Sequence, residues 1–251
     1  MNGMIFAAGL GTRLAPFTDN MPKALVEVGG RPLLEHAIEQ FVSGGVTTLV
    51  INVHHFAEQI KQYISQNRQR WPQTEILISD ETDFLLDTGG GLVKALNLFP
   101  DDRPIVVGNA DVYCNLAISW FYEQHVRSGN SATLLTQERN STRQLLFDEN
   151  GRLSGWRNKT TGDEILPRLK DVETNQLHES AFCGFHVIEQ GLIRFWLPVH
   201  KFSIIDAYLK VASDDKIGEV PLATNRYWFD VGTPEKLKLA NEFAQNQSYP
   251  Q

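Results

Sequence analysis

The residues with the clearest chemistry lie near the start of the chain, in a glycine-rich segment that also carries positive charge. An apolar run over 4–8 is followed by Gly9-Leu10-Gly11-Thr12-Arg13, and Pro22-Lys23 comes shortly afterwards. A strand that ends in such a turn lets backbone N–H groups approach a polyphosphate closely. Arg13 and Lys23 would supply the positive charge that this ligand requires. The segment therefore indicates a site for a nucleoside triphosphate.

A dinucleotide-binding oxidoreductase is the main alternative, because it also places glycines after its first strand. Its fingerprint needs a third glycine in the turn and an acidic residue at the end of the second strand. Leu14 stands where the third glycine would be, and the second apolar run, over 48–53, ends in His54-His55. Both requirements fail. A shift of the melting temperature with NAD(P) would revive this alternative.

The composition is that of an ordinary globular protein of 251 residues and 28.3 kDa. A formal net charge of −7 disfavours a protein that coats nucleic acid, because such proteins need a concentrated basic face. Cys114 and Cys183 lie far apart without the spacing of a zinc site or a disulfide framework, so we expect two buried thiols.

The sequence also bears on location. No apolar stretch is long enough to span a bilayer, and the run after Met1 lacks the basic segment and long apolar core of a signal peptide. We therefore expect a cytoplasmic protein with neither a membrane nor a nucleic-acid partner.

Strand-like and helix-like segments alternate in the first half of the chain, which is typical of a parallel sheet covered by helices. Apolar periodicity predicts strands over 3–8, 48–53, 75–79 and 105–109, and helices over 33–43, 58–64, 92–98 and 118–128. Ligands of such a sheet bind at the carboxyl ends of its strands. The Gly9 loop, a turn over 88–91 and Asp111 all fall at that edge.

The second half has a different pattern. A strand over 132–137 precedes a β-hairpin around Asn150-Gly151. Polar sequence over 158–179 predicts an irregular excursion before a strand over 182–188. A strand over 227–230 then delivers Asp230 to a loop, and Thr233 caps a helix that begins at Pro234 and continues through residue 244. The expected fold is α/β, a doubly wound, Rossmann-like mixed sheet covered by helices, with a small inserted β-hairpin subdomain.

Four sequence blocks together narrow the function. In chain order they are 7–13 with Pro22-Lys23, 87–91, 107–111 and 230–234. They resemble the sugar-1-phosphate nucleotidyltransferases, also called nucleoside-diphosphate-sugar pyrophosphorylases, over nearly the whole chain. The resemblance implies an enzyme in which a sugar 1-phosphate attacks the α-phosphorus of a nucleoside triphosphate and releases pyrophosphate. Because the attacking phosphate is already ionised, such a protein needs no general base and mainly neutralises and positions charge.

The resemblance also implies roles for individual residues. Asp111 and Asp230 would hold Mg²⁺, which takes few carboxylates alongside phosphate oxygens and waters. Arg13 would contact the β- and γ-phosphates and Lys23 the phosphates at the reacting centre, so Arg13, Lys23 and Asp111 are the candidate catalytic residues. The candidate nucleotide-binding residues are Ala8, Gly9, Gly11, Thr12, Arg13, Lys23, Gly89, Gly90 and Asn109.

The expected partners are a nucleoside triphosphate and a sugar 1-phosphate. We expect one domain over 1–251, with a nucleotide-binding half over about 1–138 and a sugar-binding half over 139–251. The short length and the 87–91 block look most like compact bacterial enzymes, including N-acetylmuramate-1-phosphate uridylyltransferases, which favours UTP with N-acetylmuramic acid 1-phosphate.

Two alternatives stay open within this resemblance. Mannose- and heptose-1-phosphate guanylyltransferases have related motifs, and residues 140–179, where sugar contacts should lie, match no substrate-defining pattern. A regulatory protein that binds a nucleotide sugar without catalysis is the other, although Arg13, Lys23, Asp111 and Asp230 are all present.

Four further polar residues receive no role from the sequence: His54, His55, Glu81 and Lys159. A histidine pair at a strand end is more often a structural hydrogen-bonding element than a ligand, and a loop lysine is more often solvated.

Overall fold

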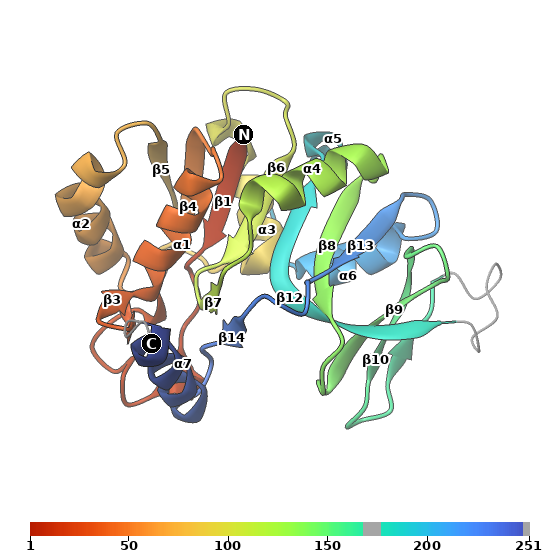
Figure 1. Cartoon of the computed structure of the whole chain (residues 1–251). Helices are drawn as coiled ribbons and strands as arrows, with labels where there is room; N and C mark the ends of the chain where they lie inside the picture. Colours follow the sequence, from red (N-terminus) through yellow and green to blue (C-terminus); the bar gives the residue numbers. More distant parts are fainter. Residues whose placement is uncertain (168–176, 248–251) are drawn as a thin grey trace.

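The structure, a computed structural model, describes residues 1–167 and 177–247. Four parallel strands form one side of its central sheet (Figure 1). In spatial order they are β5 (Glu75–Asp80), β4 (Thr48–Val53), β1 (Asn2–Phe6) and β6 (Ile105–Asn109). All four predicted strands are confirmed, with ends that differ by at most two residues. Among the described residues, no helix is both long and apolar enough to cross a bilayer.

Helices cover both faces of this sheet. One face carries α1 (Leu33–Ser43), α2 (Ala57–Asn67) and α4 (Ile118–Ser128), and the other carries α3 (Asp87–Ala95), α5 (Gln190–Arg194) and α6 (Ile204–Val211). Successive strand residues point to opposite faces. Ile5 therefore packs in one core with Phe41, while Met4 packs in the other with Tyr208. Two apolar faces explain why the strands are almost continuously hydrophobic, and the α/β prediction is confirmed.

Two predicted helices differ from the structure: α2 covers Ala57–Asn67 rather than 58–64, and α3 begins earlier than predicted. Periodicity places a helix over 92–98, whereas α3 begins at Asp87, so residues 88–91 form its first turn rather than a separate turn. Each glycine in a helix costs about 1 kcal/mol relative to alanine, which is why the pattern favours a later start. Packing of this turn against other segments outweighs that cost.

The strand β12 (His178–Ile188) joins the two halves of the molecule. Its later residues pair antiparallel with β6 and with β8 (Ala132–Gln137), and its first residues pair with β9 (Arg143–Phe147). Figure 1 shows it running from the hairpin into the main sheet. β13 (Ile217–Pro221) lies beside β8. The second half of the chain is therefore continuous with the first.

The predicted hairpin is confirmed. β9 and β10 (Leu153–Asn158) pair around a turn in which Gly151 has a φ of 68°, a value that favours glycine. The predicted irregular excursion over 158–179 lies partly outside the described residues. Its described part contains β11 (Glu164–Ile165), a short strand paired with β10 that the polar composition concealed.

The end of the chain packs against its beginning. β14 (Trp228–Asp230) pairs with β7 (Val112–Cys114), and α7 (Pro234–Gln247) lies against the short strand β2 (Glu27–Val28), which pairs with β3 (Arg31–Pro32). Leu14, Val231 and Leu237 share one buried cluster. The Thr233 hydroxyl accepts a hydrogen bond from the Lys236 N–H at 3.4 Å, so the predicted helix cap is confirmed. This cluster holds the glycine-rich loop beside the segment that carries Asp230.

Both cysteines are buried and free, as predicted.

Residues 200–204, here called the strap, cross the first turn of α3. The Phe202 carbonyl accepts a hydrogen bond from the Gly89 N–H at 2.9 Å, and the Thr88 hydroxyl accepts one from the Ile204 N–H at 2.9 Å. A Cβ atom on Gly90 would lie 2.0 Å from the carbonyl oxygen of His200. This contact explains why glycines occupy the turn.

We expect Gly90→Ala to destabilise the fold, because the added methyl group meets rigid backbone. Overpacking of this kind costs about 1–3 kcal/mol, measurable as a lower free energy of unfolding in urea. The matched control is Gly191→Ala in α5, where a Cβ atom meets nothing within 4 Å. Equal stability of the two variants would contradict the packing role of Gly90.

Candidate functional site

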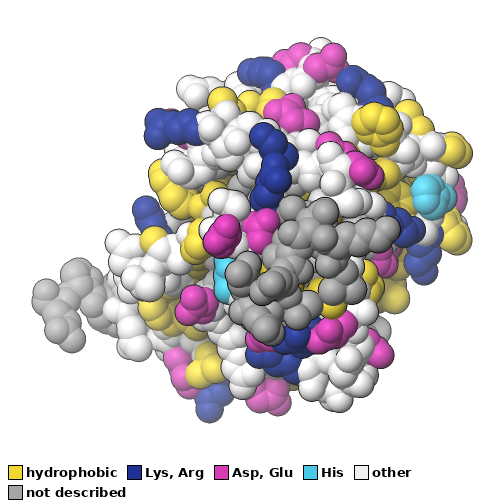
Figure 2. Space-filling view, turned by 90° about the vertical axis from the view of Figure 1, so that its right-hand side faces the viewer, with side chains coloured by type: hydrophobic (Ala, Val, Ile, Leu, Met, Phe, Trp, Pro, Cys, Tyr) yellow, Lys and Arg dark blue, Asp and Glu magenta, His cyan; other side chains and the backbone are white. Residues whose placement is uncertain are grey.

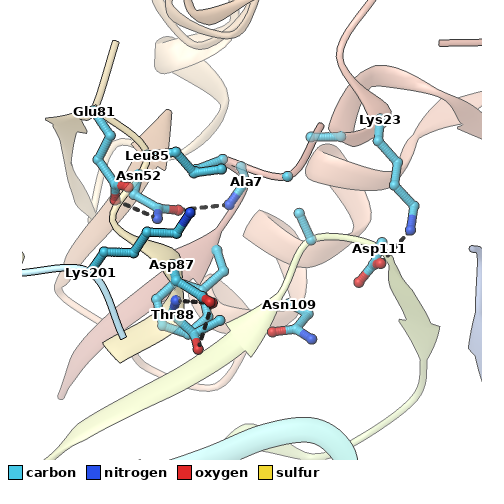
Figure 3. A pocket seen from close by; sticks show the side chains of 15 residues that line it. Ala7, Lys23, Asn52, Glu81, Leu85, Asp87, Thr88, Asn109, Asp111 and Lys201 are labelled. Carbon is cyan, nitrogen blue, oxygen red and sulfur yellow. Dashed lines mark hydrogen bonds and ion pairs between the residues drawn. The ribbon is translucent and has the colours of Figure 1, made fainter. Parts of the chain in front are cut away.

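A cavity of about 370 Å³ opens at the carboxyl ends of β1, β4 and β6, and we call it the first cavity (Figure 3). Its lining includes several residues singled out from the sequence: Ala8, Gly9, Lys23, Asn109 and Asp111. The lining does not include the other candidates: Gly11, Thr12, Arg13, Gly89, Gly90 and Asp230. Their binding roles stay predictions.

A buried chain of hydrogen bonds fixes one wall of the first cavity. The side-chain oxygen of Asn52 accepts from the Ala7 N–H at 2.8 Å, and its amide nitrogen donates to Glu81 at 2.8 Å. The second Glu81 oxygen accepts from the Leu86 N–H at 3.1 Å. Glu81 is fully buried, and this burial raises its pKa. The chain ties the glycine-rich loop to the segment that precedes α3.

Two of the residues without a role from the sequence thus belong to this wall. Glu81 is part of the chain, and the His54 ring nitrogen Nδ1 lies 2.7 Å from the Glu81 carbonyl oxygen. Asn52 was missed, although a polar side chain inside an apolar parallel strand is a usable signal. The His55 ring lies tilted against that of Phe56, with centroids 4.0 Å apart, and Lys159 pairs with Glu179 on the hairpin side.

The glycines of α3 lie behind the cavity wall. Asp87 and Thr88 line the first cavity, whereas Gly89 and Gly90 are buried against the strap. A Cβ atom on Gly91 would lie 2.7 Å from a Glu81 carboxylate oxygen. The contacts of these glycines therefore serve close packing, and the packing positions Asp87 and Thr88.

Charged side chains meet at the mouth of the first cavity. Lys23, at the start of a 3₁₀ turn over Lys23–Leu25, donates to Asp111, which follows β6 (Figure 3). The Lys23 side chain is only 12% exposed, so its charge is weakly screened by solvent. Lys201, which the sequence analysis missed, reaches the same cavity from the strap.

A backbone hydrogen bond joins the segment that carries Asp230 to Asp111. The Asp111 carbonyl accepts from the Val231 N–H at 2.9 Å, and β14 pairs with β7 beside it. Asp230 itself accepts from Lys236 at 2.6 Å. Among the described residues, no group of three or more His, Cys, Asp or Glu side chains could hold a metal ion. A pair of carboxylates on neighbouring segments suits Mg²⁺, which completes its shell with phosphate oxygens and waters.

Arg13 lies at the outer edge of this charged group. It belongs to a 3₁₀ turn over Thr12–Leu14 that follows Gly11, whose φ of 69° favours glycine. A Cβ atom on Gly232 would lie 3.5 Å from the Arg13 guanidinium and 3.0 Å from an Asp230 oxygen. The structure therefore brings Arg13 to the Asp230 loop rather than to the wall of the first cavity.

A second cavity, of about 660 Å³, adjoins the first. The two share Phe6, Asp87, Thr88 and Asn109. The second cavity extends along the hairpin, β12 and α6, and its polar lining includes Arg139, Ser141, Arg143, Gln144, Asn158, His186, Ser203 and Asp206. The sequence analysis expected sugar contacts within 140–179 but singled out none of these residues, because only the fold brings the distant segments together. Two joined cavities with charged groups at one mouth can hold two phosphate-bearing molecules side by side.

Comparison with known proteins agrees with this geometry. A family model described as nucleotidyl transferase matches residues 2–147. The chain is 32% identical over 244 residues to the N-acetylmuramate alpha-1-phosphate uridylyltransferase of Caulobacter vibrioides, covering 95% of this chain and 94% of that protein. It is 35% identical over 237 residues to the mannose-1-phosphate guanyltransferase of Hypocrea jecorina, covering 94% of this chain but 62% of that protein.

The fold has counterparts among solved structures. UDP-glucose pyrophosphorylase from Acinetobacter baumanii aligns with a TM-score of 0.77 at 15% identity, covering 100% of this chain and 94% of that one. At that identity the likeness concerns the fold.

Proposed function

The chain belongs to the nucleotidyl transferase family, among the sugar-1-phosphate nucleotidyltransferases, and we propose that it joins UTP to N-acetylmuramic acid 1-phosphate. The observation that carries the choice of substrates is the similarity to the Caulobacter uridylyltransferase, which extends over nearly the full length of both proteins. In this proposal the first cavity takes the nucleotide and the second takes the sugar.

The reaction forms one phosphorus–oxygen bond and breaks another. A phosphate oxygen of the sugar 1-phosphate attacks the α-phosphorus of UTP, and the bond to the β-phosphate breaks, so that UDP-N-acetylmuramic acid and pyrophosphate result. The attacking oxygen carries no proton that must be removed. A reaction of this kind needs no general base.

Charge neutralisation would be shared among the residues at the mouth. Asp111 and Asp230 would hold Mg²⁺, whose charge would offset that of the phosphates. Lys23, now paired with Asp111, lies where it can turn to a phosphate at the reacting centre. Arg13, on the outer side beside the Asp230 loop, suits the departing pyrophosphate, because its planar guanidinium can donate to two oxygens.

A guanylyltransferase acting on mannose 1-phosphate is the second candidate. The observation that favours it is the 35% identity to the Hypocrea enzyme over 94% of this chain. The chain spans 62% of the length of that relative.

Asp111→Asn should abolish turnover without unfolding the protein, because it keeps the side-chain shape and removes the charge. Loss of such an electrostatic contact commonly costs on the order of 100-fold or more in kcat. Pyrophosphate release at saturating Mg²⁺ and thermal melting measure the two effects. Asp214→Asn, at an exposed loop position, is the control. Activity within a few-fold of wild type would remove Asp111 from the centre.

The substrate pair is testable by comparing kcat/KM for UTP and GTP with each of several sugar 1-phosphates. We expect the highest value for UTP with N-acetylmuramic acid 1-phosphate, because a base-binding site rejects the wrong base by leaving its own polar groups unpaired. A clear preference for GTP with mannose 1-phosphate would overturn this choice and leave the family unchanged.

Lys23→Ala and Arg13→Ala should differ in their kinetic effects. Lys23→Ala should mainly lower kcat, because the stabilising charge acts mostly in the transition state, while Arg13→Ala should lower kcat and also raise the KM for the triphosphate. Steady-state kinetics with varied triphosphate separate the two. A change confined to the triphosphate KM in Lys23→Ala would make Lys23 a binding residue only.

A further inference from the structure

The second cavity contains polar atoms that the described protein leaves without partners. These buried atoms are both ring nitrogens of His186, Nε of Arg139 and the side-chain oxygen of Gln144. A buried polar group without a hydrogen bond costs about 1–3 kcal/mol. Three such side chains around one cavity indicate a site built to form hydrogen bonds, both as donor and as acceptor, with a polar ligand.

His186 cannot neutralise a charged ligand. It is 1% exposed, and this burial lowers its pKa to about 3, so the ring is neutral near pH 7. A neutral imidazole offers one donor and one acceptor, which suits a hydroxyl or an amide group. Recognition of negative charge in this cavity therefore falls to its two arginines, Arg139 and Arg143.

Arg139 is already held in place. Its guanidinium lies 4.5 Å from the ring centroid of Trp228 and donates to the Phe182 carbonyl at 3.1 Å. Trp228 begins β14, the strand that ends at Asp230. Arg139 is therefore fixed on the side of the cavity next to β14 and β12.

Arg143 is different, because its charge is not matched within the described protein. It lies exposed at the start of β9, and no carboxylate of the described residues lies within 4.0 Å of its guanidinium nitrogens. The basic residues on the adjacent strand side are matched: Arg157 pairs with Glu164 and Glu179, and Lys159 also pairs with Glu179. Figure 2, which faces this end of the molecule, shows basic and acidic side chains interspersed.

The carboxylates of the second cavity come from elsewhere. Asp87 lies on α3, where it accepts from the Thr88 N–H at 2.6 Å, and Asp206 lies in the first turn of α6. The lining is therefore basic where the hairpin contributes and acidic where the helices contribute. Such a cavity orients a ligand whose negative substituent points towards the hairpin.

We propose that Arg143 binds a carboxylate carried by the sugar and thereby selects acidic sugar 1-phosphates. The planar guanidinium can donate two parallel hydrogen bonds to a carboxylate. The proposal rests on the proposed function in that the second cavity takes the sugar, and it holds for any sugar with a carboxylate. N-acetylmuramic acid has one, on the lactyl ether that distinguishes it from N-acetylglucosamine.

The test compares matched sugars on matched variants. We would assay four proteins with N-acetylmuramic acid 1-phosphate and with N-acetylglucosamine 1-phosphate. They are wild type, Arg143→Gln, Arg143→Lys and the control Arg127→Gln, whose position on α4 is exposed. We expect Arg143→Gln to lower kcat/KM for the acidic sugar by about 10- to 100-fold, as for a lost charged hydrogen bond, and for the neutral sugar by less than about threefold. The KM for UTP should not change, and Arg143→Lys should keep part of the preference.

Equal losses on both sugars, or no loss on either, would overturn the role of Arg143. If Arg143→Gln melts well below wild type, Arg143→Lys decides between a binding role and a structural role. A structural role would lower kcat/KM for both sugars by the same factor. Glucuronic acid 1-phosphate and glucose 1-phosphate, each with UTP and GTP, separate this proposal from the substrate assignment. Wild type that prefers glucuronic acid 1-phosphate would refute N-acetylmuramic acid and support Arg143, whereas a preference for neutral sugars would refute Arg143.

Discussion

The close packing of the strap on the glycine turn of α3 is the constraint on which both cavities depend. Asp87 and Thr88, at the start of this turn, lie in the wall between the two cavities. The strap hydrogen bonds to the turn, and residues on either side of this contact face different cavities, with Lys201 in the first and Ser203 in the second. At Gly90 the contact requires glycine because the backbone of His200, rather than a flexible side chain, lies against it. One backbone contact thus fixes the positions of the two cavities relative to each other.

The charges at the reacting centre are balanced in pairs before any substrate binds. Asp111 forms an ion pair with Lys23, and Asp230 forms one with Lys236. Neither carboxylate is left as an uncompensated charge, which would be costly at a partly buried position. The proposed phosphate chemistry would rely on this local arrangement and not on the net charge of the whole chain, which is −7.

Local patterns in the sequence predicted most of the fold and part of the site. Helices such as Leu33–Ser43 and Ile118–Ser128 were predicted with correct ends, because their apolar spacing is set by their own residues. Asp111 and the glycine-rich loop were also found, since they follow strands directly. Arg143 and His186 were not found, because they line a cavity that is formed by segments far apart in the chain. The helix over 92–98 was predicted to start too late, because the packing of Gly89 and Gly90 against the distant strap outweighs the low helix propensity of glycine.

The bridging position of β12 has a consequence for how the chain is made. Until residues 178–188 leave the ribosome, β6 has β1 on one side and an open edge on the other. An unpaired edge is a template for pairing with another chain. The first half of the protein, with its glycine-rich loop and Asp111 already synthesised, therefore emerges with exposed backbone donors and acceptors at the centre of its future sheet. Synthesis of the hairpin delays the closing of this edge, and chaperones that shield nascent chains would act during that interval.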